Sequence, residues 1–155
     1  MDFSFTAEQL EHRRRVVSFA QESLGKDMML RDKNSVFSHE LWKKCADFGI
    51  QGAAFPKKFG GADLDIVTTT LLMEGLGYGC KDSGLIFAMN GQMWTVQMPI
   101  MRFGTEVQRE RYLPRLCRGE SIGAHGMSEP GSGSDAFGLT TTARRTPRAP
   151  RPRRC

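Results

Sequence analysis

The stretch from Asp82 to about Phe103 constrains the fold most, because its apolar side chains point in nearly every direction around a helix. A helix that is apolar all round must be covered on several sides, which places it in the middle of a helical bundle. Pro99 lacks a backbone N–H, so we expect it to kink or end this helix. The apolar residues are Leu85, Ile86, Phe87, Met89, Met93, Trp94, Val96, Met98, Ile100 and Met101.

Four further helices are predicted around this one from the signals at their ends. Thr6 with Gln9, and Thr105 with Gln108, form capping boxes, in which each side chain satisfies an unpaired backbone N–H of the first helical turn. We therefore expect a mainly α fold, an antiparallel bundle of about five helices. The four predicted helices cover residues 6–25, 38–48, 65–78 and 105–116.

Three glycines lie near the end of the predicted helix 65–78. Gly75, Gly77 and Gly79 each weaken a helix. Their presence indicates either close packing against a neighbouring helix or early termination.

The sequence pattern changes after residue 118. Residues 121–127 and 137–143 are predicted as short strands, separated by the Gly- and Ser-rich loop 128–135. Two strands make a poor sheet alone, so this β part reads as the beginning of a larger element. The predicted domains are a helical domain (1–118), the start of a β domain (119–143) and a disordered tail (144–155).

The net charge of +5 comes from the C-terminal tail. Six of the 22 basic residues are arginines within residues 144–155, and residues 1–143 hold 16 basic and 17 acidic groups. Arg-Pro repeats cannot bury a core, which predicts disorder. Such a tail could neutralise phosphates, but it has no aromatic side chain on which a base could stack. We therefore do not expect nucleic-acid binding, and a basic nucleic-acid binder is kept as an alternative that predicts salt-sensitive DNA binding lost on deletion of residues 144–155.

Several other classes of protein are excluded by composition and spacing. No apolar run reaches the roughly 18 residues that a membrane helix needs, and the charged N-terminus is unlike a secretory signal. The four cysteines lack the Cys-x-x-Cys spacing of metal or redox sites, which favours reduced thiols in a cytoplasmic protein. His12 and His39 have no ligating neighbours in the sequence, so we expect no metal site.

The loop in residues 123–135 is the most specific stretch, with the sequence Gly-Ala-His-Gly-Met-Ser-Glu-Pro-Gly-Ser-Gly-Ser-Asp. Gly131 and Gly133 would let a ligand approach the backbone closely, and the N–H groups of such a loop can hold an anion. Met127 would place an apolar side chain beside a flat ring. No Gly-Lys-Ser/Thr follows, so the loop is not a P-loop. A plain surface turn is the alternative interpretation.

With this loop and the motifs before it, the chain resembles the N-terminal part of the acyl-CoA dehydrogenase family over residues 3–143. The loop piece, Ser128-Glu-Pro-Gly-Ser-Gly-Ser-Asp135, is the most specific. The other ordered pieces are Phe5-Thr-Ala-Glu-Gln9, Gly49-Ile50 with Gly52, Pro56 and Phe59-Gly-Gly61, Gln97-Met-Pro-Ile100, Phe103-Gly-Thr-Glu106, and Tyr112-Leu-Pro114.

The resemblance implies a helical domain, a middle β-barrel domain and a C-terminal four-helix domain, with this chain holding the first and a truncated second. Members of the family bind FAD and oxidise acyl thioesters between Cα and Cβ. A glutamate removes the α proton, and the flavin accepts a hydride. Carried over residue by residue, His125, Met127 and Ser128 would face the isoalloxazine ring. Gly133 and Ser134 would continue along the flavin, with Ser134 also reaching the pantetheine arm.

The same resemblance places substrate contacts on the helix 82–103, which lines one side of the acyl pocket in the family. Met89, Met93 and Thr95 are the candidates, together with Ser134. No carboxylate is a convincing base, because we expect Glu74 to be solvated or packed on its helix and Glu129 to brace the loop. We therefore assign no catalytic residue and expect the chain alone to be inactive.

The departures from the family pattern raise alternatives. Arg144-Arg145 is the last point of agreement, and we interpret the tail as out-of-frame translation or a mispredicted terminus. The expected partner is an acyl thioester of coenzyme A or of acyl carrier protein, while the family's electron-transfer partner would dock mainly on missing regions. Exposed apolar surface predicts self-association or a complementary chain. The alternatives are a non-catalytic helical interaction module and one part of a split enzyme.

Overall fold

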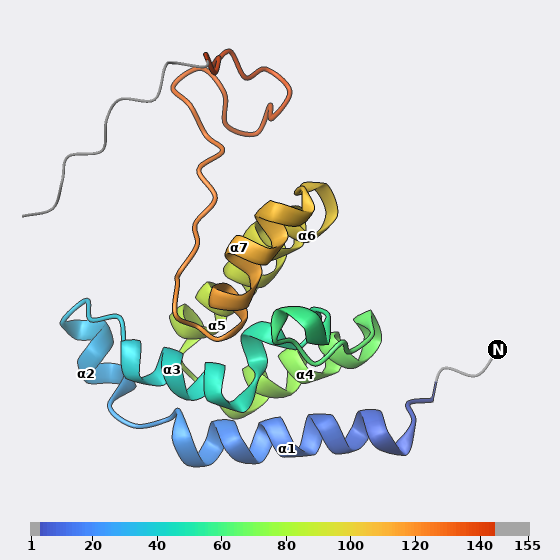
Figure 1. Ribbon diagram of the computed structural model, residues 1–155. Coiled ribbons are helices and arrows are strands. Elements are labelled where there is room, and N and C mark those ends of the chain that lie inside the picture. The colour runs from blue at the N-terminus through green and yellow to red at the C-terminus, as the bar shows by residue number, and fades with distance from the viewer. Residues whose placement is uncertain (1–3, 145–155) are drawn as a thin grey trace, which may run out of the picture. The chain divides into compact units, whose positions relative to one another are not determined.

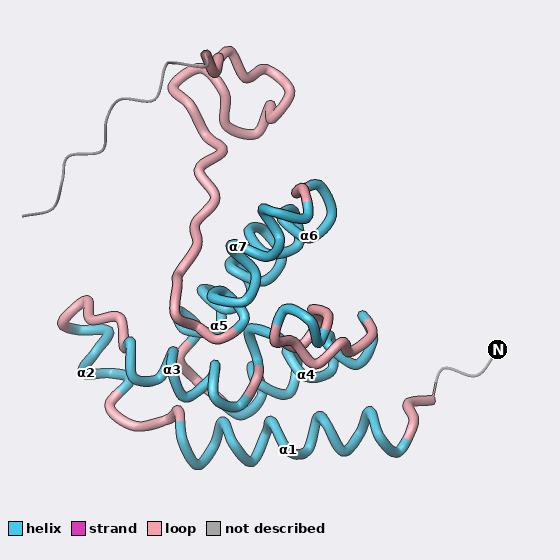
Figure 2. The backbone as a smooth tube through the Cα atoms, viewed as in Figure 1, coloured by secondary structure: helices cyan, strands magenta, loops and turns pink. Residues whose placement is uncertain are grey.

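The computed structural model describes residues 4–144, so the predicted tail lies outside the described residues from residue 145 onward. The chain divides into two compact units, Met1–His125 and Gly126–Cys155. The mainly α fold is confirmed (Figures 1 and 2), and the predicted domain boundaries stay predictions. The helices are α1 (Ala7–Ser23), α2 (Met28–Lys33), α3 (His39–Phe48), α4 (Ile66–Gly79), α5 (Ser83–Asn90), α6 (Met98–Phe103) and α7 (Glu106–Cys117), with the 3₁₀ turns η1 (Ile50–Gly52) and η2 (Lys57–Phe59) and the π-helical turn η3 (Gly91–Gln97).

Both predicted capping boxes are present. The Thr6 hydroxyl accepts from the Gln9 N–H at 3.2 Å, and the Gln9 side chain accepts from the Thr6 N–H at 3.0 Å. Thr105 and Gln108 make the same pair of bonds at the start of α7. These predictions hold because a cap depends only on residues three positions apart. The short helix α2 was not predicted, and no side-chain cap marks its start.

Helices α1 and α4 pack side by side at the base of the helical unit (Figure 1). A Cβ at Gly75 would lie 2.7 Å from Val16 Cγ1, and a Cβ at Gly79 would lie 2.8 Å from the Val17 carbonyl oxygen. The close packing predicted from the glycines is therefore present at Gly75 and Gly79. Gly77 meets no atom within 4 Å and takes no part in it.

The same two helices run in the same direction, because the chain returns through α2 and α3 between them. Gln9, in the first turn of α1, donates to Thr68 in the first turn of α4 at 3.4 Å. One turn further along, the Arg13 guanidinium donates to both carboxylate oxygens of Glu74, at 2.5 and 3.0 Å. The two helices are thus held in register by polar contacts that begin in the first turns and reach Glu74, directly beside the close approach at Gly75.

The apolar segment 82–103 forms one continuous helical path through α5, η3 and α6. Its buried side faces the core with Leu85, Met89 and Met93. Two side chains on its other sides lie open, since Phe87 is 78% and Phe103 89% exposed. Pro99 does not end the helix, which continues to Phe103 after the π-helical turn. Most of the predicted apolar residues are covered, because partly buried side chains also pack against the core: Ile86, Trp94, Met98, Ile100 and Met101.

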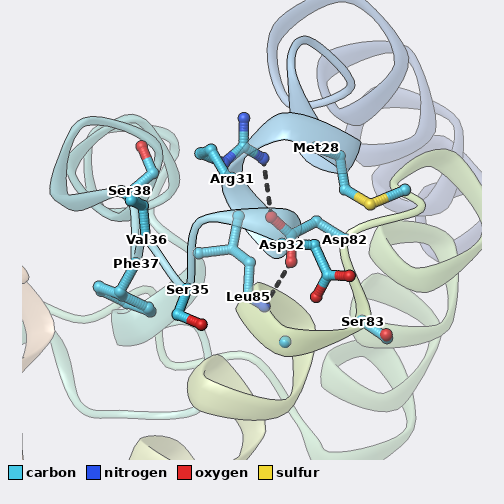
Figure 3. A pocket seen from close by; sticks show the side chains of 11 residues that line it. Met28, Arg31, Asp32, Ser35, Val36, Phe37, Ser38, Asp82, Ser83 and Leu85 are labelled. Carbon is cyan, nitrogen blue, oxygen red and sulfur yellow. Dashed lines mark hydrogen bonds and ion pairs between the residues drawn. The ribbon is translucent and has the colours of Figure 1, made fainter.

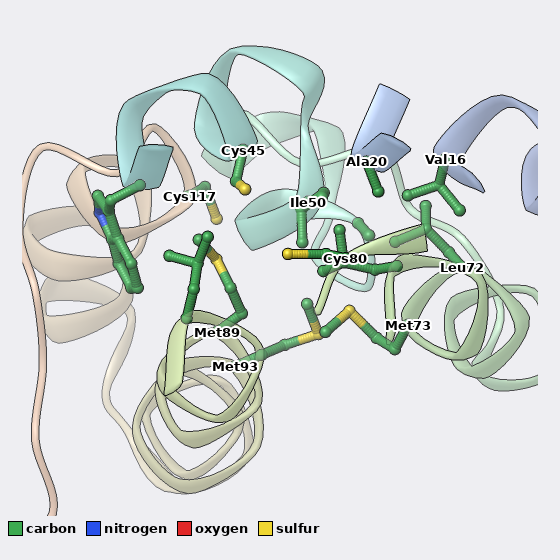
Figure 4. Close-up of a cluster of buried hydrophobic side chains, with 14 of the residues drawn as sticks. Val16, Ala20, Cys45, Ile50, Leu72, Met73, Cys80, Met89, Met93 and Cys117 are labelled. Carbon is green, nitrogen blue, oxygen red and sulfur yellow. The ribbon is translucent and has the colours of Figure 1, made fainter. Parts of the chain in front are cut away.

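The core joins α1, α3, α4, α5 and α7 around sulfur-containing and aliphatic side chains (Figure 4). Cys45, Cys80 and Cys117 are buried free thiols. Burial raises the pKa of Cys45 to about 12 and that of Cys117 to about 11. Both thiols therefore stay protonated and act as small apolar side chains, since only the thiolate is reactive.

The predicted strands are not confirmed. Residues 122–128 and 139–144 run without strand pairing (Figure 2), and one isolated antiparallel bridge joins Glu129 to Ser132 within the described part of the second unit. A strand is defined by hydrogen bonds to a neighbour, and no paired segment is present in residues 126–144 to supply them. Across residues 4–144, no helix is both long and apolar enough to span a bilayer.

The substitution Gly79→Ala tests the α1–α4 contact. Its Cβ would lie 2.7 Å from Ala20 Cβ and 2.8 Å from the Val17 carbonyl oxygen, so the helices must separate. We expect a loss of about 1–3 kcal/mol in the free energy of unfolding, the usual cost of overpacking. Urea unfolding followed by circular dichroism measures it.

Gly77→Ala is the matched control, because its Cβ meets no atom within 4 Å in the same helix. It should stabilise the chain by about 0.5–1 kcal/mol through helix propensity. Equal effects of the two substitutions would show that the close approach at Gly79 contributes nothing.

Candidate functional site

The Gly- and Ser-rich loop is closed by the carboxylate of Glu129. One oxygen accepts from the Thr140 N–H at 2.5 Å and from the Thr140 hydroxyl at 2.9 Å. The other accepts from the Thr141 N–H at 3.0 Å and from the Thr141 hydroxyl. Glu129 thus braces the start of the loop against residues 140–141, which follow it, as predicted, and these bonds hold Glu129 as the anion.

These hydrogen bonds lower the pKa of Glu129 to about 2, with the bond from the Thr141 hydroxyl as the largest cause. Hydrogen bonds donated to a carboxylate stabilise its charged form. Glu129 is therefore ionised and fully engaged at neutral pH, which argues against its acting as a base.

The turn within the loop has its own bonds. The Ser132 hydroxyl, which is buried, donates to the Asp135 carbonyl oxygen. Asp135 accepts from the Gly138 N–H at 3.1 Å through its side chain, which confirms the predicted turn-stabilising role. Ser132 and Asp135 therefore serve the shape of the loop.

The predicted flavin contacts of the second unit lie exposed on this loop. Met127 is 48% exposed, and Ser128, Gly133 and Ser134 are also exposed. A Cβ at Gly131 or Gly133 would meet no atom within 4 Å. Packing within the described residues thus gives no reason for glycine there, whereas a ligand close to the backbone would.

His125 belongs to the first unit and is exposed. Two residues earlier, the Gly123 N–H donates to Gln92 Oε1 at 2.9 Å. A Cβ at Gly123 would lie 2.6 Å from Val96 Cγ1, so this segment lies directly against η3. The path of the chain toward His125 is thus fixed by two contacts with one helical turn.

The predicted substrate contacts do not share one face of the helix. Met89 and Met93 lie in the core with no exposed surface (Figure 4). Thr95 is exposed, and its hydroxyl donates to the Gly91 carbonyl oxygen at 2.5 Å. Of the three, Thr95 alone presents surface to a ligand, and the assignments of all three stay predictions.

Two buried glutamines in η3 were missed by the sequence analysis. Gln92 Nε2 donates to the Leu116 carbonyl oxygen at 3.2 Å, and Gln97 Nε2 donates to the Gln51 carbonyl oxygen at 2.9 Å. Each amide thus adds a side-chain hydrogen bond to a backbone carbonyl group, and that of Leu116 also accepts from the Gly119 N–H at 3.1 Å. The signal in the sequence was a pair of glutamines five residues apart within an apolar helix.

A separate cavity of about 320 Å³ lies between α2, the start of α3 and the start of α5 (Figure 3). An ion pair of 2.8 Å between Arg31 and Asp82 crosses it, and Asp82 also accepts from the Leu85 N–H at 2.9 Å. Burial opposes the charge of Asp82, but these hydrogen bonds outweigh it and lower its pKa. No predicted site residue lines this cavity, and Asp82 is used in capping α5.

The remaining candidate base, Glu74, is also engaged. Its carboxylate accepts two hydrogen bonds from Arg13, and the pKa of Glu74 is lowered chiefly by these bonds. A base needs a raised affinity for a proton, so this environment disfavours that role. Within residues 4–144, no three His, Cys, Asp or Glu side chains gather in a way that could hold a metal ion.

Comparison with known proteins identifies one family. The family described as "Acyl-CoA dehydrogenase, N-terminal domain" matches residues 6–120. An L-prolyl-[peptidyl-carrier protein] dehydrogenase from Serratia sp. (strain ATCC 39006) is 34% identical over 143 residues, which cover 92% of this chain and 37% of that protein. The mitochondrial isovaleryl-CoA dehydrogenase of Bos taurus is 35% identical, with 88% of this chain and 32% of that protein covered.

Solved structures agree with this result. The prolyl acyl carrier protein oxidase AnaB matches with a TM-score of 0.89 and 47% identity, covering 93% of this chain and 38% of AnaB. PigA with FAD and proline matches with a TM-score of 0.88 and 33% identity, covering 94% of this chain and 38% of PigA. The chain thus spans well under half of the length of these relatives.

The pKa of Glu129 gives a pH test of the loop. Because its folded value of about 2 lies below its ordinary value of 4.5, Glu129 stabilises the closed loop fully above pH 4.5. This contribution is lost as the pH falls toward and through 2. The amide signals of Thr140 and Thr141 should therefore titrate well below pH 4.5 in an NMR series.

The control is Glu129→Gln, which removes the titrating group while it keeps an acceptor oxygen. Its Thr140 and Thr141 amide signals should show no transition over the same range. A wild-type midpoint at 4.5 would instead mean that the carboxylate is not held by the two threonines.

Proposed function

The chain belongs to the acyl-CoA dehydrogenase family, and we propose that it supplies the helical domain and part of the flavin site for the oxidation of an acyl thioester. The observation that carries this proposal is the loop at residues 128–135. Its shape is held by Glu129, Ser132 and Asp135, while Ser128 and Ser134 remain exposed. One set of residues holds the shape of the loop, and a different set stays accessible to a ligand. This arrangement is suited to binding.

FAD is the proposed cofactor, and the residues present fit it. The space at Gly131 and Gly133, where a Cβ would meet nothing within 4 Å, allows a flat ring system or its chain to approach the backbone. The relative PigA has been solved with FAD. When bound, FAD supplies the hydride acceptor for the oxidation of Cα–Cβ.

The residues of this chain would then bind and orient. Met127 offers an apolar surface to the isoalloxazine, and the Ser128 hydroxyl offers a hydrogen-bond donor to its polar edge. His125 is proposed to face the same ring. Ser134 is proposed to reach the pantetheine arm, which coenzyme A and carrier proteins have in common.

A thioester held on a carrier protein is the proposed substrate, with the prolyl thioester as the first candidate. The support is the 47% identity to AnaB, described as a prolyl acyl carrier protein oxidase. The coenzyme A-dependent relative from Bos taurus is 35% identical. Thr95, Met89 and Met93 are the proposed acyl-side contacts, of which Thr95 has exposed surface.

The described residues alone are proposed not to complete the reaction. Glu74 is bound by Arg13, and Glu129 is bound by Thr140 and Thr141, so neither is free to remove the α proton. The base would come from another part of the fold or from a second chain, as in a split enzyme.

Equilibrium binding of FAD to the purified chain tests the proposal. Flavin fluorescence should be quenched on binding, and Ser128→Ala should weaken the affinity by about 3- to 10-fold, the value of one hydrogen bond. Thr142→Ala is the control, since Thr142 is exposed and lies outside the loop at residues 128–135. It should leave the affinity unchanged.

Two results would contradict the proposal. An absence of FAD binding by the wild-type chain would favour the non-catalytic interaction module. Bleaching of bound flavin by a prolyl carrier-protein thioester, with no other chain added, would show that these residues contain a working base after all.

A further inference from the structure

We propose that Gln92 is a positioning residue for His125, the proposed flavin contact of the first unit, because its side chain holds the backbone at Gly123 and so sets the path of the chain into His125. The effect on FAD rests on the proposed function, whereas the effect on the backbone does not. Gln92 touches neither substrate nor cofactor in this assignment, and it acts only through the segment 123–125.

The Gln92 amide uses both of its ends in this contact. Oε1 accepts from the Gly123 N–H at 2.9 Å, and Nε2 donates to the Leu116 carbonyl oxygen at 3.2 Å. The side chain is 1% exposed, so water does not compete for either bond. One amide therefore ties the last turn of α7 to the segment that follows it six residues later in the chain.

A second, independent contact holds the backbone of Gly123. A Cβ added to Gly123 would lie 2.6 Å from Val96 Cγ1 and 3.3 Å from Val96 Cβ, so the Val96 side chain packs directly against this residue. A Cβ at residue 123 would force either Val96 or the backbone to move, since real Cβ contacts of this length do not occur without movement. The backbone of Gly123 thus contacts two side chains of η3, the amide of Gln92 and the aliphatic side chain of Val96. We call this pair of contacts the grip on Gly123.

The π-helical form of η3 is what brings these groups together. In a π-helix, hydrogen bonds join residues five apart, and such turns occur frequently at functional sites. Gln92 and Gln97 are five residues apart, and both are turned inward with at most 1% exposed. Val96 precedes Gln97 in the same turn and packs against Gly123. The turn η3 therefore supplies both contacts with Gly123, from Gln92 and from Val96.

Hydrogen exchange of the Gly123 amide in the full chain without FAD tests the positioning role. Gln92→Met removes both hydrogen bonds and keeps the volume of the side chain. The Gly123 N–H should then exchange about 3- to 10-fold faster, as expected for the loss of one hydrogen bond. FAD affinity should fall in the same variant.

Gln97→Met is the matched control, because it removes an equally buried amide from the same turn. Gln97 donates to the Gln51 carbonyl oxygen and to Cys117 Sγ, and neither contact reaches Gly123. A merely structural role for Gln92 would make the two variants alike: both would melt lower, and Gly123 exchange would change equally in both or in neither. That outcome overturns the proposal.

A rescue pair keeps the test decisive if Gln92→Met does not fold. Gly123→Ala should raise exchange at residue 123 and weaken FAD binding, and Val96→Ala in the same chain should restore both by removing Cγ1. Failure of that rescue would overturn the proposal. If wild-type chain binds no FAD while the exchange pattern follows Gln92, the proposed function fails but the grip on Gly123 stands.

Discussion

The close approach of α1 to α4 sets the geometry on which the helical unit depends. Gly75 and Gly79 bring the two backbones together, and the Arg13–Glu74 pair fixes their register beside Gly75. The end of α4 then delivers Cys80 to the core and leaves Asp82 to cap α5. Because α5 continues directly into η3, the position of the π-helical turn follows from where α4 ends.

Buried side chains help to attach the segment that follows α7 to the rest of the helical unit. The last carbonyl groups of α7 have no partner within the helix, and Gln92 donates to one of them, that of Leu116. Its other end accepts from Gly123, and Trp42 Nε1 donates to the Gly119 carbonyl oxygen at 3.1 Å. The segment leaving α7 is therefore held by these side chains in addition to backbone bonds, since the Glu120 N–H donates to the Arg115 carbonyl oxygen at 2.9 Å and the Gly119 N–H to that of Leu116 at 3.1 Å.

The features predictable from the sequence were those with local causes. The caps of Thr6 and Thr105 depend on residues three positions away, and they were placed correctly. The role of Gln92 depends on partners 24 and 31 residues later, Leu116 and Gly123, which no local pattern can reveal. The predicted strands are not confirmed for a related reason, since threonine-rich sequence favours a strand but pairing must come from another segment. The candidate site residues came from the family resemblance, while the role of Glu129 as a brace followed from its position in the loop.

The division of tasks inside the loop is the strongest physical argument for a ligand there. Three residues of the loop form hydrogen bonds within the second unit that maintain the shape of the loop: Glu129, Ser132 and Asp135. No hydrogen bond among residues 4–144 uses the hydroxyl of Ser128 or Ser134, although both lie in the same eight residues. A surface turn needs no such separation, because its side chains can all face water at no cost. A binding loop needs it, since the groups that meet the ligand cannot also maintain the shape that presents them.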